Sequence, residues 1–444
     1  MAGEWRETTL GEVTDFLSGG TPSKDRPDYW AGSIPWVSAK DMKRFRLDDT
    51  EDHVSDDGVA KGTKLVPAGS VLLLTRGMTL LNDMPICVIS RAMTFNQDVK
   101  ALRPKPHVRS DYLPYLLLGN KDRLLSLVDL AGHGTGRLNS DELKALNIAL
   151  PPLPEQRAIA HILGTLDGKI ELNRRMNETL EAMARALFKS WFVDFDPVRA
   201  KMEGRDAGIP QPLADLFPAR LLASELGEIP EGWEVKPLCE CVDVARGLSY
   251  KGSGLSEKGV PMHNLNSIYE GGGYKHDGLK RYDGDYKSQH VARAGDLIVA
   301  NTEQGHQRLL IGYAAIVPTR FDQECLFSHH IYRVRPKRES RLTADYLCHL
   351  LNTSVMHDIV SGFANGTTVN MLPIDGLQSP LMVVPPARAI SAFTGIAEAA
   401  RLRHEEMIEE SCTLAALRDT LLPGLVSGEL RVRDAEKFVR RNAS

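Results

Sequence analysis

The sequence lacks the features of a secreted or membrane-embedded protein. Cysteine is scarce, with six among 444 residues, too few and too scattered for the disulfide framework of a secreted scaffold. No apolar run approaches the roughly 18 residues that a membrane-spanning helix needs. The opening stretch, MAGEWRETTLGE, carries charges where a secretory signal would be apolar. We therefore expect a cytoplasmic protein with no membrane partner.

An excess of charge of either sign is also missing. Hydrophobic residues make up 42% of the chain, charged residues 25%, and the formal net charge is −4. This composition is usual for folded globular proteins and excludes wholesale disorder. It argues against non-specific coating of DNA but permits local basic patches. At about 100–200 residues per domain, the length predicts two to four compact units.

Motifs of catalysis are absent. The chain has no G-x-x-x-x-G-K-[ST] loop, which argues against a motor driven by nucleoside triphosphates, and no G-x-S-x-G elbow around a serine. One loose group of soft ligands could approach a metal ion but lacks the close spacing of zinc sites: Cys325, His329, His330, Cys348 and His349. We predict neither a catalytic residue nor a metal site.

The chain contains an internal repeat. Four residues reappear 228 positions later, and these are Trp5, Leu10, Glu12 and Gly19, matched by Trp233, Leu238, Glu240 and Gly247. Further matches follow in the same order, such as Arg157-Ala158-Ile159 with Arg388-Ala389-Ile390. An ordered series at a nearly constant offset predicts a duplicated architecture.

The first part of each repeat, over 1–150 and 229–384, is rich in Gly and Pro. Short apolar runs bounded by turn residues are typical of strands, and they lie at 71–74, 86–89, 297–300 and 331–334. A helical stretch near 111–128, and another near 343–360, interrupts each set. The pattern predicts two similar mixed α/β domains, an α+β fold overall.

The second part of each repeat has helical periodicity. Over 151–196, apolar residues recur in alternating steps of four and three, the seam of a coiled coil, at Ile159, Leu163, Leu166, Ile170, Leu180, Leu187 and Trp191. The same frame places Asn173 and Asn177 on the seam, where buried amides weaken pairing but fix its register. At 1.5 Å per residue, such a helix would be about 60 Å long.

A weaker seam runs over 385–422, with His404 and Ser411 inside it. Its apolar members are Ile390, Phe393, Met407, Leu414 and Leu421. Antiparallel pairing of the two helices would bury both stripes, although packing of each helix on its own domain stays an alternative. We expect an irregular linker at 197–228, where Gly and Pro are frequent, and a C-terminal tail at 423–444.

Several segments are similar to one known family. PPLPEQRAIA at 151–160, LDGKI at 166–170 and Trp191-Phe192 closely resemble the first conserved region of specificity subunits of type I restriction-modification systems. GGTPS at 19–23 looks like part of that family's first target recognition domain, and EIPEGW at 228–233 like the start of its second copy. The second copy departs from the pattern at Pro386-Ala387, where the first has Glu155-Gln156.

The resemblance implies a non-catalytic DNA-binding subunit. Two target recognition domains, separated by two long antiparallel helices in a coiled coil, would read the two halves of a bipartite, asymmetric site in double-stranded DNA. Methyltransferase subunits, two per chain, and a motor-nuclease subunit would dock on it. The chain itself would bind no cofactor, since S-adenosylmethionine, ATP and Mg²⁺ would belong to those partners.

Side chains that read bases are Arg, Lys, Asn, Gln and hydroxyl residues in loops beside short strands. In the first domain the candidates for DNA contacts are Ser38, Lys40, Thr75, Arg76, Asn96, Gln97 and Arg137. In the second they are Asn264, Asn266, Asn301, Gln304, Arg308, Ser328 and His330. For each of them the alternative is a turn-forming residue or a charge exposed to solvent.

Other functions remain open from the sequence alone. The chain could serve a methylation-only or differently organised restriction assembly. It could also be a scaffold that joins two protein-binding domains without DNA, which its acidic net charge favours slightly. A single-chain nuclease would need a metal-binding set of carboxylates that the sequence does not reveal.

Overall fold

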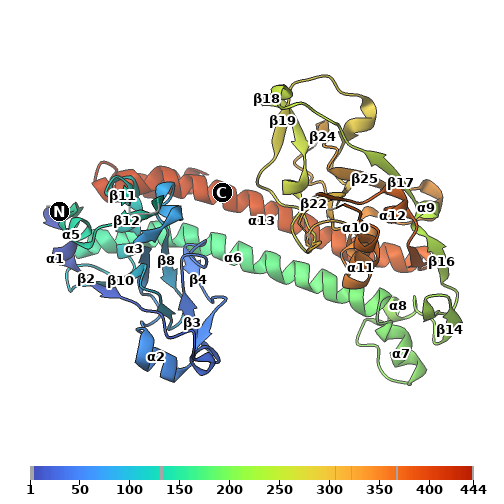
Figure 1. The fold of residues 1–444 in the computed structure, drawn as a ribbon, viewed down its shortest axis with the longest axis horizontal. Coiled ribbons are helices and arrows are strands. Elements are labelled where there is room, and N and C mark those ends of the chain that lie inside the picture. The colour runs from blue at the N-terminus through green and yellow to red at the C-terminus, as the bar shows by residue number, and fades with distance from the viewer. Residues whose placement is uncertain (1–4, 131–133, 306, 322, 367–368, 443–444) are drawn as a thin grey trace. The chain divides into compact units, whose positions relative to one another are not determined.

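The computed structural model describes residues 5–130, 134–305, 307–321, 323–366 and 369–442. The chain forms two compact units (Figure 1). The first comprises Met1–Arg174 with Ile408–Ser444, and the second comprises Arg175–Met407. Among the described residues, none of the helices combines the length and the apolar character needed to span a membrane.

The first domain is built around a five-stranded sheet. Its order is β2 (Thr14–Ser18), β10 (Val99–Pro104), β6 (Val71–Leu74), β8 (Ile86–Ile89) and β4 (Arg46–Leu47). All four residues of β6 are buried, as expected for a continuous apolar run in a central strand. The helices α3 (Leu113–Gly119) and α4 (Lys121–Leu125) fill the predicted helical stretch, and α3 contributes most of its residues to the core.

Smaller sheets and short helices complete this domain. The sheets are β1 (Arg6–Thr9) with β13 (Asn147–Leu150); β5 (His53–Val54), β3 (Ile34–Val37) and β9 (Thr94–Phe95); and β11 (Val128–Leu130), β12 (Gly136–Leu138) and β7 (Arg76–Gly77). The short helices are α1 (Leu10–Val13), α2 (Asp56–Gly62) and α5 (Ser140–Ala145).

The second domain has the same plan. Its main sheet is β17 (Val242–Arg246), β25 (Ile331–Pro336), β21 (Leu297–Ala300) and β23 (Ala314–Ile316). The remaining strands are β16 (Glu234–Pro237) with β27 (Leu381–Val384); β19 (Lys280–Tyr282), β18 (Leu255–His263), β24 (Cys325–Phe327) and β20 (Val291–Ala292); and β22 (Thr302–Gln304) with β26 (Val369–Met371). Its helices are α9 (Leu238–Cys241), α10 (Ala344–Leu351), α11 (Ser354–Gly362) and α12 (Ile374–Gln378).

The predicted duplication is confirmed in detail. β3 and β9 pair in parallel through Val37 and Phe95, and β18 and β24 do the same through His263 and Phe327. The repeated glycines have one physical explanation. A Cβ on Gly19 would lie 2.1 Å from the Phe95 carbonyl oxygen, and the same atom on Gly247 would lie 2.1 Å from that of Ser328. Only glycine fits where these backbones meet.

The two long helices are α6 (Leu153–Phe192) and α13 (Ala387–Ser427). They pack against each other as predicted. Within the first unit, Leu163 and Leu166 share a core with Leu414 and Leu421. Within the second, the rings of Phe188 and Phe393 lie 5.3 Å apart. In each unit, higher residue numbers on one helix meet lower numbers on the other, so the pairing is antiparallel.

The segment predicted as an irregular linker is instead folded. It contains α7 (Asp196–Met202), α8 (Gln211–Ala214) and a hairpin of β14 (Leu221–Ser224) with β15 (Gly227–Pro230). Val198, Phe217 and Ile229 are buried in the second unit's core. The prediction of a linker was wrong because Pro starts α7 and α8, and Gly227, with a φ of 93°, makes the hairpin turn.

The predicted end of the second long helix at Leu422 was also wrong. α13 continues through Pro423 to Ser427, and α14 (Val432–Asn442) replaces the expected tail. Proline removes one hydrogen bond from the helix interior. Burial of Leu425 and Val426, and of Ala435 on α14, in the first unit's core offsets that loss.

Candidate nucleic-acid interface

In both domains, loops that follow corresponding strands meet at the same edge of the sheets. Backbone hydrogen bonds establish the equivalence. Asn96 N donates to Val37 O at 2.9 Å, and Ser328 N donates to His263 O at 2.9 Å. In the same way, Thr75 N donates to Asp98 O and Asn301 N donates to His330 O. We call residues 21, 75–77, 96–98 and 137 the first loop edge, and residues 250, 280, 301–304 and 328–330 the second loop edge.

Five predicted DNA-contacting residues are buried, and side chains of several of them form hydrogen bonds within the loops. Thr75 Oγ1 donates to Asp98 O at 2.9 Å, and Asn96 Oδ1 accepts from Asp98 N at 3.0 Å. Such local contacts are the usual structural use of these residue types. Burial argues against base contacts from five of the predicted residues in this conformation: Thr75, Asn96, Asn264, Asn301 and Ser328.

Ser38 and Lys40 are also engaged inside the first domain. The Ser38 hydroxyl donates to Asp41 Oδ2 at 2.8 Å. Lys40 Nζ lies 3.0 Å from Glu51 Oε2 and 2.9 Å from Asp52 Oδ2. Two carboxylates neutralise this ammonium group, so it is a poor candidate for a phosphate or base contact.

Arg76 and Arg137 form the most distinctive feature of the first loop edge. They lie directly opposite each other on β7 and β12, and both are exposed. Within the described part of the chain, no carboxylate lies at ion-pair distance from either guanidinium group. Like charges directly opposite in a sheet are destabilising. Two facing arginines without a counter-charge form a site that suits an anionic ligand.

The remaining candidates lie at the surface or are partly buried. Gln97 is exposed, and its Oε1 accepts from Thr21 Oγ1 at 2.6 Å. Asn266 and Gln304 are exposed, whereas Arg308, with a φ of 52°, is partly buried. His330 is also partly buried, with its Nδ1 2.9 Å from Thr302 Oγ1.

The second loop edge contains three residues that the sequence did not single out as DNA contacts. They are Tyr250, Lys280 and His329. Lys280 Nζ donates to Tyr250 Oη at 2.7 Å, and the Tyr250 and His329 ring centroids are 6.1 Å apart. Basic residues interleaved with aromatic ones would have been the signal, but here they come from three distant segments.

The polar residues on the helix seam pair across it. Asn173 Nδ2 donates to Glu410 Oε2 at 2.7 Å in the first unit, and Asn177 Nδ2 donates to His404 O at 3.5 Å in the second. Of the predicted seam residues, Ile159, Leu163, Leu166, Trp191, Ile390, Phe393, Met407, Leu414 and Leu421 are buried, while Ile170, Leu180 and Leu187 are partly buried.

Buried polar contacts attach each domain to these helices. In the first unit, Asp167 on α6 accepts from Tyr115 Oη at 2.8 Å and from Arg418 on α13 at 2.7 Å. In the second, Arg401 on α13 donates to Asp345 on α10 at 3.0 Å. Burial opposes the charge of Arg401, but its hydrogen bonds to carboxylates raise its pKa overall.

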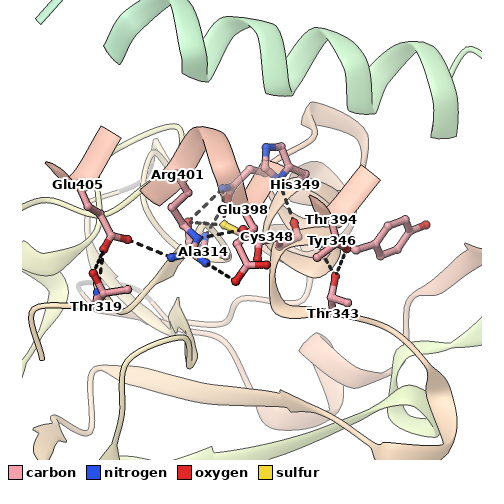
Figure 2. A network of polar contacts seen from close by, with 12 residues as sticks. Ala314, Thr319, Thr343, Tyr346, Cys348, His349, Thr394, Glu398, Arg401 and Glu405 are labelled. Carbon is pink, nitrogen blue, oxygen red and sulfur yellow. Dashed lines mark hydrogen bonds and ion pairs between the residues drawn. The ribbon is translucent and has the colours of Figure 1, made fainter. Parts of the chain in front are cut away.

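Figure 2 shows how the second unit extends this network. Arg401 donates to Glu405 Oε1 at 3.0 Å, and Thr319 N donates to Glu405 Oε2 at 2.8 Å. Three elements are thereby linked through buried polar groups: α10, α13 and the loop after β23.

No group of three or more His, Cys, Asp or Glu side chains within the described ranges is arranged to hold a metal ion. The cysteines and histidines noted in the sequence as possible metal ligands make separate contacts within the protein. Cys325 Sγ lies 3.0 Å from the buried His263 Nε2, whereas Cys348 and His349 lie on α10, where His349 Nδ1 is 2.9 Å from Asp345 O.

Comparison with known proteins identifies relatives along the chain. The family described as "Type I restriction modification DNA specificity domain" matches residues 2–182. The MjaIX specificity subunit of Methanocaldococcus jannaschii, a type I restriction enzyme subunit, is 25% identical over 97% of this chain and 94% of its own length. The EcoR124I/EcoR124II specificity subunit of Escherichia coli is 34% identical over 37% of this chain and 41% of its own length.

A solved structure shares the fold. The S subunit of a type I restriction-modification system from M. genitalium aligns with a TM-score of 0.59, covering 95% of this chain and 96% of that one at 12% identity. Together with the matched domain and the full-length relative, the repeated domains and paired helices lead to one conclusion. Over most of its length, the chain is similar to specificity subunits of type I restriction-modification systems.

Proposed function

We propose that the chain selects the DNA sequence on which a type I restriction-modification complex acts. Its two domains read the two halves of a bipartite, asymmetric target in double-stranded DNA. The chain performs no catalysis and holds no cofactor. S-adenosylmethionine, ATP and Mg²⁺ act in its partners, two methyltransferase subunits and a motor-nuclease subunit. The complex works in the cytoplasm, where the DNA of a prokaryotic host lies.

The observation that supports this proposal best is the pair of loop edges. One duplicated scaffold presents different side chains at equivalent positions, which suits two domains that read different half-sites. At the first loop edge, Arg76 and Arg137 lack a carboxylate partner within the described residues and face each other. Arginine pairs bidentately with guanine or phosphate, and a good base contact contributes about 1–3 kcal/mol of discrimination.

The long helices support the second part of the proposal. Residues of both units lie on α6 and α13, and a helix pair of fixed register suits a spacer between two reading domains. Exposed apolar residues on α6 in the second unit, Met176 and Met183, suit a docking surface for the methyltransferase.

Mapping of methylated adenines tests the function directly. A host that expresses the chain with its methyltransferase should methylate one split motif, and that methylation should disappear when either gene is omitted. Methylation by the chain alone would refute its non-catalytic role. Methylation with the same motif in the absence of the chain would refute its role in sequence selection.

A further inference from the structure

A second basic site lies at the second loop edge. Lys280 Nζ is 5.3 Å from the centroid of the Tyr250 ring, in addition to its hydrogen bond with the hydroxyl group. The imidazole rings of His329 and His330 lie with centroids 3.8 Å apart. We call Tyr250, Lys280, His329 and His330 the imidazole cluster. It joins the loop after β17, strand β19 and the loop between β24 and β25.

The cluster has no counter-charge of its own. Among the residues that the structure describes, no carboxylate lies at ion-pair distance from Lys280, and all four side chains are partly exposed. Burial, together with the nearby His329 and Lys280, lowers the pKa of His330. The cluster therefore combines one ammonium group with two imidazole rings and a phenol ring, a chemistry that suits nucleic acid.

Buried polar atoms beside the cluster lack hydrogen-bond partners in the described structure. They are Asn301 Oδ1, Ser328 Oγ and His329 Nδ1, and Asn301 and Ser328 are 3% and 0% exposed. At the first loop edge, the equivalent Thr75 and Asn96 both form hydrogen bonds through their side chains. Buried polar groups without partners are rare, and a group of three at one place indicates that the site is completed by something that binds there.

The free ring nitrogens define what the cluster can recognise. Nδ1 of His330 is hydrogen-bonded to Thr302 Oγ1, which leaves Nε2 available to bind a ligand. Together with Lys280, this nitrogen suits a partner with two adjacent acceptors. In the DNA major groove, guanine presents two acceptors side by side, N7 and O6.

We propose that the imidazole cluster contacts a guanine in the half-site read by the second domain. This inference rests on the proposed function. It assigns the contact to Lys280 and His330, with His329 and Tyr250 as positioning residues that support them. The first loop edge, where Gln97 and Arg76 stand at positions equivalent to His329 and Thr302, would read the other half-site with different chemistry.

The test is adenine-methylation mapping in a host that expresses the full chain with its methyltransferase. His330→Ala and Lys280→Ala should each reduce discrimination at one guanine of one half-site by about tenfold, the effect of one lost base contact. The other half-site should be read as before. Lys258→Ala, an exposed lysine on β18 outside the cluster, is the matched control and should leave the motif unchanged.

A variant that changes the preferred base, rather than only weakening binding, distinguishes a lost base contact from misfolding. Because glutamine pairs with adenine N6 and N7, His330→Gln should shift the preferred base at that position from guanine towards adenine. An unchanged motif in all three cluster variants would overturn the inference, as would equal loss of methylation at every site, which indicates a phosphate contact. If the unaltered chain directs no motif at all, the proposed function itself fails.

Discussion

The two copies of the repeat differ most where each domain meets its long helix. In the first, Trp5 Nε1 donates to Glu155 Oε2 at 3.1 Å, and the buried Gln156 donates to the backbone oxygens of His107 and Pro151. In the second, Pro386 and Ala387 occupy these helix positions, and the buried Trp233 Nε1 has no hydrogen-bond partner among the described residues.

Aromatic packing takes the place of this polar contact in the second copy. The Trp233 ring lies 5.6 Å from Phe195 and 5.9 Å from Phe192, within the core that also buries Phe217. Duplication thus retained the apolar positions of the scaffold and let its polar contacts diverge. The segment that most resembles the family, PEQ at 154–156, is in this molecule a structural attachment of the first domain.

The largest predicted difference in stability between the two units comes from substitutions on the seam between α6 and α13. Leu163 is fully buried in the first unit, whereas Leu180 in the second is only partly buried. Leu163→Asp buries a charge in an apolar core and should destabilise the first unit by more than about 4 kcal/mol. Leu180→Asp should cost on the order of 1 kcal/mol.

Hydrogen exchange of the amides in each unit measures both effects on the seam. Equal protection of the two variants would contradict the assignment of Leu163 to the core. The two variants should also differ in co-purification with the methyltransferase. The Leu163→Asp chain should fail to co-purify, whereas the Leu180→Asp chain should co-purify unless the exposed side of Leu180 forms the docking surface.

The next largest predicted loss of stability comes from breaking the buried ion pairs. Asp167→Ala leaves Arg418 buried without its principal partner and should destabilise the first unit by about 3–5 kcal/mol. Asp345→Ala should destabilise the second unit by less, because Arg401 keeps its ion pair with the buried Glu405. As a matched control, Asp141→Ala removes an exposed pair with Lys144 and should cost less than about 1 kcal/mol. Thermal unfolding followed unit by unit distinguishes them, and a shift confined to the wrong unit would refute the assignment.

Low pH should destabilise the second domain through His263, a histidine that has no counterpart in the first domain. Burial lowers the pKa of His263 to about 4 from the ordinary 6.5, and Val37 occupies its position in the first copy. Below pH 6.5, His263 binds a proton in the unfolded state but stays neutral in the folded state. The free energy of unfolding therefore falls as the pH drops from 6.5 to 4. The loss should reach about 3 kcal/mol at pH 4.

His263→Val should remove about half of this pH dependence. His276, whose pKa is also lowered to about 4, chiefly by burial, accounts for a remainder. Urea unfolding of the second unit between pH 7 and pH 4 checks the prediction. The same slope in the variant and the unaltered chain would show that other groups dominate.

The smallest effect concerns the attachment of the first domain. Gln156→Ala leaves the backbone oxygens of His107 and Pro151 and the amide of Arg109 without their partner, and should cost about 1–3 kcal/mol. Ala387→Gln, the reciprocal change, should bring no stabilisation because aromatic packing around Trp233 takes the place of this polar contact in the second copy. A gain in unfolding temperature for Ala387→Gln would contradict this account.

Much of the fold could be predicted because periodicity and repetition are local in sequence. The runs at 71–74, 86–89 and 297–300 are strands, and the seam through Leu163 and Phe393 is buried. The linker could not be predicted, since Pro and Gly also start helices and turn hairpins. DNA-reading residues could not be separated from turn residues, because Asn96 and Asn301 have the same chemistry whether they bond to a base or to a backbone.

The imidazole cluster shows the other limit of the sequence. Tyr250, Lys280 and His329 are separated by long stretches of chain. Their segments are brought together by the pairing of β18 with β19 and β24 and by the bridge between Leu248 and Ser328. No local pattern marks such a group, whereas Arg76 and Arg137 stand out once β7 and β12 are seen to pair.

The central claim is that one scaffold reads two different half-sites through equivalent loop edges. The most direct measurement is the methylated-adenine motif directed by a chain with both Arg76→Ala and Arg137→Ala. The account predicts relaxed base preference in one half of the motif, with the half assigned to the second domain unchanged. An unaltered motif, or relaxation of both halves together, would contradict it.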